Sequence, residues 1–163
     1  MYRIAIRICS SHKADVEGKV EPCQLYTAPM IQAFHRFCTE HKIHHAVLSR
    51  KNGIMRDDLK FAQYGDIAEL DRPDLLAKLQ KQCRGVFSPN CTVFYYWNPR
   101  PLTGTTWVHL LREAGFSVED VRGSLEDLLA AIKKDEAEEL AASMAPKPIK
   151  TGPQPRAASM KLF

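Results

Sequence analysis

Short stretches of alternating or β-branched apolar residues are separated along the chain by longer stretches in which apolar residues recur every three or four positions. The short stretches predict strands at residues 2–8, 43–49, 92–97 and 116–121. The longer stretches predict helices at residues 27–41, 74–83, 103–114 and 124–144. This alternation predicts an α/β fold, a single domain with a mostly parallel sheet of about four strands flanked by helices.

Local signals mark the starts of two helices. Thr27 is a candidate N-cap with Pro29 in the first turn, and Ser124 forms a capping box with Asp127. One apolar stripe of the last helix is expected to face the core, formed by Leu125, Leu128, Leu129, Ile132, Leu140 and Met144. Residues 54–72 show no consistent pattern, so no element is predicted there.

The composition changes after Met144. Four prolines fall between Pro146 and Pro155, and residues 144–163 contain four basic residues and no acidic one. The whole formal net charge of +4 therefore lies in this segment. Such a segment cannot bury a core, so we expect an α/β domain at residues 1–144 and a disordered, basic, Pro-rich tail at residues 145–163.

The composition also argues against several classes of protein. Apolar residues make up 45% of the chain and charged residues 26%, which is typical of a soluble globular domain. No apolar run approaches the roughly 20 residues that span a bilayer, and the start of the chain is unlike a signal peptide. We therefore expect a cytoplasmic protein with no membrane partner. Five cysteines without a C-x-x-C pair argue against a disulfide framework and a zinc ribbon.

Signals for metals and cofactors are weak. His41, His44 and His45 have the spacing H-x-x-H-H, but no carboxylate or cysteine completes a familiar set of ligands. The glycine spacing of a Walker loop or a dinucleotide fingerprint is absent, which disfavours nucleoside triphosphate and NAD binding. No metal or cofactor is predicted.

Three polar loops follow predicted strands, at residues 9–13, 49–53 and 98–105. Such loops would meet at the carboxyl ends of the strands, where open parallel sheets bind ligands. They would bring together four cations, which are Lys13, Arg50, Lys51 and Arg100. Thr103 and Thr105 would stand at a helix N-terminus, whose free backbone N–H groups favour an anion. The loops predict a basic site for a phosphate-bearing ligand.

Several of these residues also have a structural explanation. The candidates for the chemistry are Cys9, Ser10 and His12, with His12 as a general acid or base. A cysteine at a strand end is also typical of a buried core position, although nearby cations would lower the pKa of its thiol. Lys13 and Lys51 fit solvated loop positions as well, and Ser49 can hydrogen-bond the turn that it begins.

Three motifs in order resemble a known family. They are Cys9-Ser10-x-x-Lys13, Leu25-Tyr26-Thr27-x-Pro29 and Val47-Leu48-Ser49-x-Lys51-x-Gly53, followed by Tyr64. They resemble the motifs CSxxK, LYTxxLF and ILSAKYGL, followed by PY, of a small uncharacterised bacterial and phage domain that looks related to the YaaA proteins of peroxide-stress response. The resemblance covers about residues 2–122 and departs from the family at Arg50 and Asn52.

The resemblance implies a compact α/β domain with a base- or nucleotide-directed role, such as that of an N-glycosidase or a lyase, because the family occurs near nucleic-acid-modification genes. Carried over by position, the candidate site residues are Cys9, Ser10, Lys13, Tyr26, Ser49, Lys51 and Gly53.

The chain ends in Ser159-Met160-Lys161-Leu162-Phe163. This segment resembles the peptide QLxLF that binds the bacterial sliding clamp, with Ser159 in place of Gln. Leu162 and Phe163 would be the residues that anchor in an apolar pocket of that partner. The alternative is a tail whose last two side chains pack on the body of the protein.

Three hypotheses for the function remain open. The leading one is an enzyme that acts on a nucleotide, a nucleobase or a nucleic acid, with a phosphate held by Lys13, Lys51 and the helix start near Thr103. The alternative is a non-catalytic, DNA-associated adaptor whose tail captures a partner. In the third, a partner binds the acidic helix at residues 124–143.

Overall fold

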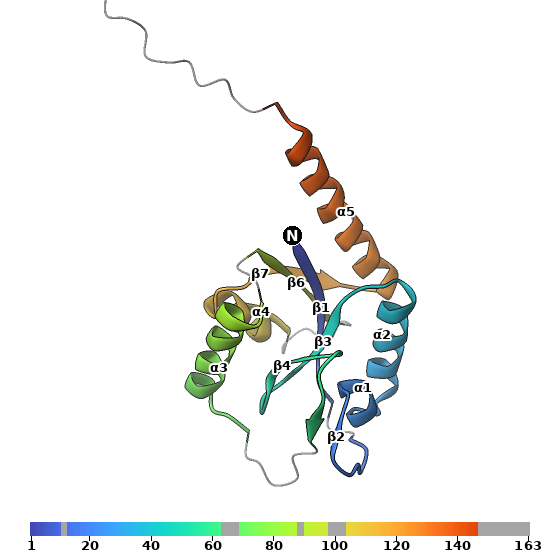
Figure 1. Cartoon of the computed structure of the whole chain (residues 1–163), viewed down its shortest axis with the longest axis vertical. Coiled ribbons are helices and arrows are strands. Elements are labelled where there is room, and N and C mark those ends of the chain that lie inside the picture. Colours follow the sequence, from blue (N-terminus) through green and yellow to red (C-terminus); the bar gives the residue numbers. More distant parts are fainter. Residues whose placement is uncertain (11–12, 63–68, 88–89, 98–103, 147–163) are drawn as a thin grey trace, which may run out of the picture.

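The computed structural model describes residues 1–10, 13–62, 69–87, 90–97 and 104–146. Five strands form one sheet in the order β4-β3-β1-β6-β7 (Figure 1). Their bounds are Tyr2–Ile8 for β1, His45–Ser49 for β3, Gly53–Arg56 for β4, Cys91–Trp97 for β6 and Ser117–Arg122 for β7. β1 pairs in parallel with β3 and β6, and β7 pairs in parallel with β6. The predicted α/β fold with a mostly parallel sheet is confirmed.

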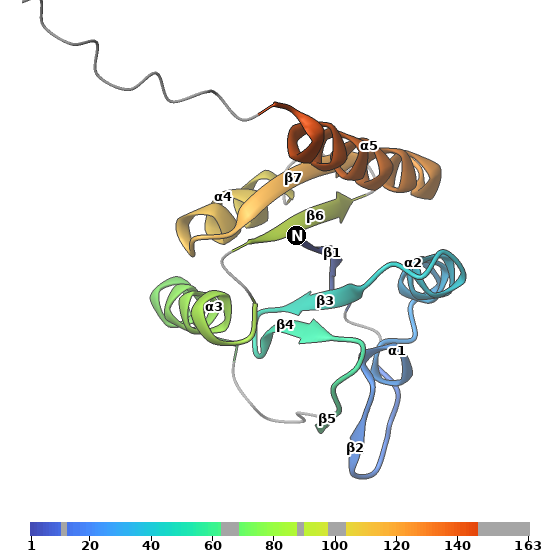
Figure 2. The same ribbon diagram turned by 45° about the horizontal axis from the view of Figure 1, so that its top comes forward.

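Helices cover both faces of this sheet (Figure 2). Their bounds are Pro29–Glu40 for α2, Arg72–Gly85 for α3, Gly104–Glu113 for α4 and Leu125–Met144 for α5. Phe34 of α2 and Leu128 of α5 pack with Ala5 of β1, whereas Leu79 of α3 packs with Ile6 of β1. Successive side chains of a strand point to opposite faces, so the middle of the central strand, Ile4 to Ile6, is apolar on both sides.

Some short elements were not predicted. β4 pairs antiparallel with β3, a two-residue ribbon joins β2 to β5, and α1 is a single turn. The bounds of these short elements are Lys19–Val20 for β2, Phe61–Ala62 for β5 and Pro22–Leu25 for α1. Each is too short to show a period in the sequence.

The helix starts confirm one capping prediction and correct another. Ser124 Oγ accepts the backbone N–H of Asp127 at 3.2 Å, and Asp127 Oδ2 accepts the backbone N–H of Ser124 at 2.8 Å, so the predicted capping box is present. The prediction of Thr27 as a cap was wrong. The N-cap of α2 is Ala28, and Pro29 at the first helical position supplies the fixed φ that starts the helix.

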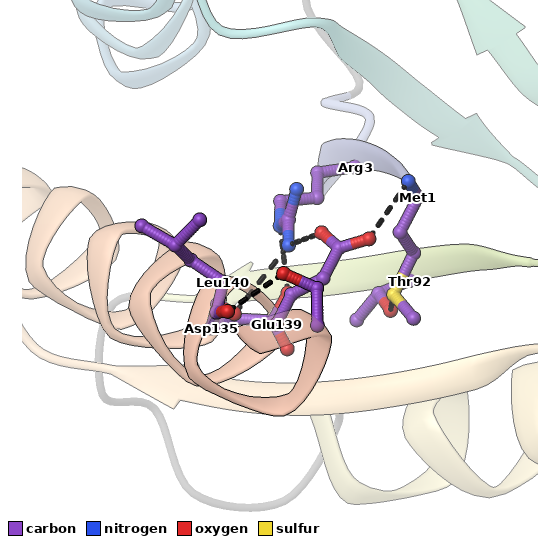
Figure 3. Close-up of polar contacts among 7 residues, drawn as sticks. Met1, Arg3, Thr92, Asp135, Glu139 and Leu140 are labelled. Atoms are coloured by element: carbon purple, nitrogen blue, oxygen red, sulfur yellow. Dashed lines mark hydrogen bonds and ion pairs between the residues drawn. The ribbon is translucent and has the colours of Figure 1, made fainter. Parts of the chain in front are cut away.

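Charged groups tie α5 to the start of β1 (Figure 3). Arg3 Nε donates to Asp135 Oδ2 at 2.6 Å, and Arg3 also forms an ion pair with Glu139. The amino group of Met1 donates a hydrogen bond to Glu139 Oε1 at 3.0 Å. These hydrogen bonds lower the pKa of Glu139. Leu140, one helical position later, is 62% exposed and Met144 is 75% exposed, so the predicted apolar stripe was wrong beyond Ile132. The last turns of α5 extend past the sheet (Figure 1).

A side chain of α3 holds the turn between β3 and β4. Gln82 Oε1 accepts the backbone N–H of Ile54 at 2.9 Å, and Gln82 Nε2 donates to the carbonyl oxygens of Asn52 and Ile54 at 3.3 and 2.9 Å. Gly53 has a φ of +67°, and a Cβ there would lie 2.4 Å from Gln82 Oε1. Glycine is therefore required at this turn for its backbone conformation and for the close approach of Gln82.

Replacing Gly53 with Ala should destabilise the protein more than replacing Gly18 with Ala. Gly18 also has a positive φ, +73°, but its Cβ would meet nothing within 4 Å, so Gly18→Ala adds backbone strain alone, at about 1–2 kcal/mol. Gly53→Ala adds the same strain and displaces Gln82, for a total of about 2–4 kcal/mol. Urea unfolding of both variants measures the difference. Equal losses would mean that Gln82 does not hold the turn.

Two histidines join α2 to β3. His45 is buried, and its Nδ1 lies 3.0 Å from the carbonyl oxygen of Ile43, so Nδ1 carries a hydrogen and donates. Its Nε2 then accepts from Nδ1 of His35, 2.7 Å away. Asp57 Oδ2 lies 3.4 Å from His45 Nδ1. Burial, and then the neighbouring His45, lower the pKa of His35, against smaller opposing effects of Asp57 and Glu21.

Acid should weaken the fold through His35. Because its pKa is lower in the folded protein than in the unfolded chain, the unfolded chain binds more protons, and stability falls as the pH decreases below about 6.5 towards the folded pKa. His35→Gln keeps an N–H donor for His45 but cannot titrate. Urea unfolding between pH 5 and 7.5 should show a shallower pH dependence for His35→Gln than for the wild type. Identical slopes would contradict this assignment.

Candidate functional site

The carboxyl ends of β1, β3 and β6 lie side by side at one edge of the sheet, as the sequence predicts. Ile8 pairs with Leu48, and the backbone N–H of Cys9 donates to the carbonyl oxygen of Leu48 at 2.8 Å. The loops after β1 and β3 therefore start next to each other. The chain leaves β1 towards β3 and leaves β6 towards β7, so β1 and β6 flank the point where the strand order reverses. Open α/β sheets bind ligands at such a point.

Cys9 lies at this edge as a protonated thiol. Burial raises the pKa of Cys9, and this outweighs the opposing effects of Lys13 and of the backbone amide of Arg50. The side chain packs against the cluster that contains Tyr26 and Val47. The expected lowering of the thiol pKa by neighbouring cations is thus outweighed by desolvation, which does not favour a thiolate nucleophile. Ser10, the next residue, is half-buried.

Tyr26 lies beneath Lys13. The two residues form an isolated antiparallel bridge, and Lys13 Nζ lies 6.0 Å from the centre of the Tyr26 ring. Tyr26 is completely buried, and its hydroxyl donates to Met55 Sδ at 3.7 Å. Lys13 is exposed. In this arrangement Tyr26 supports Lys13, which is the member of the pair that reaches solvent.

Residues of the loop after β3 shape the loop itself. Ser49 is 2% exposed, and its Oγ accepts the backbone N–H of Lys51 at 3.1 Å, which is the turn contact considered from the sequence. Gly53 serves the turn held by Gln82. Lys51 is half-buried, and its carbonyl oxygen accepts from Lys78 Nζ at 3.3 Å. Ser49 and Gly53 therefore position the chain on which Arg50 and Lys51 stand.

A cavity of about 260 Å³ opens on the α3/α4 side of the same edge. Its lining consists of Arg50, Leu70, Arg72, Leu75, Thr106, Trp107 and Leu110. Arg50 follows β3, Arg72 begins α3, and Thr106 and Trp107 belong to the first turn of α4. Two helix starts, with their partial positive charge, therefore meet at this cavity. Of these residues only Arg50 was predicted. Arg72 and Trp107 lack a local motif that would have singled them out.

The cations of the cavity are held by weak, exposed pairs. Arg50 Nη1 lies 3.4 Å from Glu69 Oε2, and both side chains are 60% exposed. Arg72 Nη2 donates to Glu113 Oε2 at 2.5 Å, again between exposed side chains. Arg50 Cζ also lies 5.9 Å from the centre of the Trp107 ring. Exposed ion pairs contribute about 0–1 kcal/mol, so an anionic ligand can replace either carboxylate at little cost.

Several predicted residues lie outside the described part of the chain. They are His12, Arg100, Thr103, Leu162 and Phe163. The backbone of Thr105 lies in the first turn of α4, as predicted, but its side chain is not described. The tail from residue 147 onwards is also outside this part.

The described residues offer neither a metal site nor a membrane span. These contain no group of three or more His, Cys, Asp and Glu side chains that would hold a metal ion. None of the described helices has the length and apolar character needed to cross a membrane.

Comparison with known proteins identifies no relative of this chain. No protein-family model matches the chain, and neither a curated protein nor a solved structure is detectably similar to it. The resemblance to the YaaA-related domain therefore stays a prediction from the three sequence motifs.

Proposed function

We propose that the protein acts on a nucleotide, either free or exposed in a nucleic acid, which it binds at the carboxyl edge of the sheet. The observation that carries this proposal is the cavity lined by Arg50 and Arg72 together with the indole of Trp107, which is 5% exposed. A guanidinium forms paired hydrogen bonds with phosphate oxygens, and the indole belongs to the apolar wall against which a base would lie. The two kinds of group thus match the two parts of a nucleotide.

The size and charge of the cavity support this ligand class. Its volume of about 260 Å³ is near the lower end of the range for small-molecule sites, which favours a single nucleotide unit over a dinucleotide. Leu70, Leu75 and Leu110 complete the apolar wall. Binding of a phosphate would release Arg50 from Glu69, a pair too exposed to compete strongly.

The candidate groups for chemistry lie at the same edge of the sheet as this cavity. Cys9 packs with Tyr26 and Val47, and the pKa of its thiol is influenced by the backbone amide of Arg50, a residue that also lines the cavity. Ser10 and Lys13 follow on the loop after β1 and supply a hydroxyl group and an ammonium group. An N-glycosidase- or lyase-like reaction, which the family resemblance implies, would use these groups. A non-catalytic adaptor would bind the same ligand without turnover, so product analysis separates the two.

Nucleotide binding should depend on the two arginines of the cavity. We expect Arg50→Ala and Arg72→Ala each to weaken the binding of a nucleoside monophosphate about 10- to 100-fold, because each removes a charge-assisted contact. Arg84→Ala is the matched control, since Arg84 is an exposed arginine at the far end of α3 and changes the net charge equally. Calorimetric titration of the four proteins measures the affinities. Equal affinities of all four would refute the proposal.

The basic tail is the competing source of affinity for nucleic acid. It carries the whole net charge of +4, so it would attract any polyanion in a salt-dependent manner. Deleting residues 145–163 leaves the cavity intact and should leave the affinity for a mononucleotide within about twofold. A larger loss would assign the binding to the tail instead of the sheet edge.

A further inference from the structure

Arg7 is a half-buried cation near the end of β1. It is the second-last residue of this strand, and its Nη1 is buried without a hydrogen-bond partner among the described residues. No ion pair joins it to a carboxylate in the described part of the chain, and no carboxylate contributes to the shift of its pKa. Its Cζ lies 5.5 Å from the centre of the Tyr96 ring.

Arg3, on the same strand, is a cation whose charge is neutralised by carboxylates. Arg3 and Arg7 lie four residues apart on the same face of β1, towards α2 and α5. Arg3 receives Asp135 and Glu139 from α5 (Figure 3). No acidic residue of α5 or α2 acts on the pKa of Arg7. The difference follows the direction of the strand, with Arg3 at the amino edge of the sheet and Arg7 at the carboxyl edge.

Asp127 is an acidic residue whose charge acts on Tyr96, and it is already held in the capping box. Tyr96 donates its hydroxyl to the carbonyl oxygen of Gly123 at 3.1 Å, just before α5, and experiences the charges of Glu126 and Asp127. From α2, Phe34 stacks on the Tyr96 ring with centres 5.9 Å apart. Within the described residues, the aromatic ring of Tyr96 thus lies next to Arg7 with Phe34 behind it, and no carboxylate pairs with the guanidinium.

A charge that is partly taken out of water and lacks a partner weakens a folded protein. Burial lowers the pKa of Arg7, which reports the cost of taking its charge out of water. Buried polar groups without partners are rare, and one that persists calls for a ligand or a solvent partner. Arg7 stands on β1 and Tyr96 on β6, the two strands that flank the reversal of strand order. Ligands of open α/β sheets bind there.

We infer that Arg7 is the core of an oxyanion-binding site at the carboxyl edge, on the α2/α5 face, with Tyr96 as its aromatic wall. The ligand is a phosphate or carboxylate group, because a planar guanidinium pairs with two oxygens of either. The site lies on the opposite face of the sheet from the Arg50–Trp107 cavity and does not require that cavity to bind a nucleotide. Binding would supply the negative charge that α5 supplies to Arg3.

Thermal unfolding in phosphate, acetate and chloride at equal ionic strength and pH tests this inference with the full chain. Phosphate or acetate, at ten or more times its dissociation constant, should raise the Tm of the wild type by about 3–6 °C relative to chloride. Arg7→Met should abolish this rise and should unfold in chloride at or above the Tm of the wild type, because it removes an uncompensated charge. Arg3→Met is the matched control. It should lower the Tm in every salt and keep the anion-dependent rise.

A second readout covers the case in which Arg7→Met fails to fold. The Nε–H resonance of Arg7, assigned by its absence in Arg7→Lys, should shift on titration with phosphate or acetate. The inference is overturned if neither anion shifts that resonance, or if Arg7→Met keeps the rise in Tm. Arg50→Ala separates the two sites. It should weaken nucleotide binding and leave the anion response of Arg7 unchanged, so failure of one proposal is visible without failure of the other.

Discussion

The parallel pairing of β1 on both of its edges is the constraint on which the rest of the structure depends. Ala5 pairs with His45 of β3 on one side and with Phe94 of β6 on the other. With both edges hydrogen-bonded and both faces covered, β1 cannot slip by one residue without turning Ile4 and Ile6 away from the core that they share with α3 and α4. The fixed register brings the carboxyl ends of three strands, and every candidate site residue at those ends, to one edge.

The sequence predicted the elements that repeat a period and missed those that do not. β1 and β6 alternate or run apolar over seven residues each, and α2 repeats at the helical spacing, so their positions follow from the pattern. β4 spans four residues, and its strand character comes from pairing with β3, which no local pattern records. The exposure of Leu140 was missed for a similar reason. The apolar stripe of α5 is a local pattern, whereas the width of the sheet decides where the helix leaves the core.

The meeting of the strand ends could be predicted, but the contacts of the candidate residues could not. Topology alone brings the loops after β1 and β3 together. The Tyr26 hydroxyl donates a hydrogen bond to Met55 Sδ, and Met55 belongs to β4. Because β4 was not predicted, the role of Tyr26 could not be anticipated. The pKa of Cys9 depends on a balance of burial against nearby positive groups, and only the fold fixes the burial. Trp107 occupies an ordinary apolar helix position, and only the approach of Arg50 makes it a cavity wall.

The two edges of the sheet pair the arginines of β1 differently, and this difference supports the proposal of an anion site at the carboxyl edge. At the amino edge the half-buried Arg3 is paired with two carboxylates, as is usual for a cation taken out of water. At the carboxyl edge the half-buried Arg7 has no carboxylate partner among the described residues. A fold that neutralises one arginine of a strand with two carboxylates has the means to neutralise the other. Departures from such local rules concentrate where binding repays their cost. The strand that organises the fold thus also carries the charge on which the proposed anion site rests.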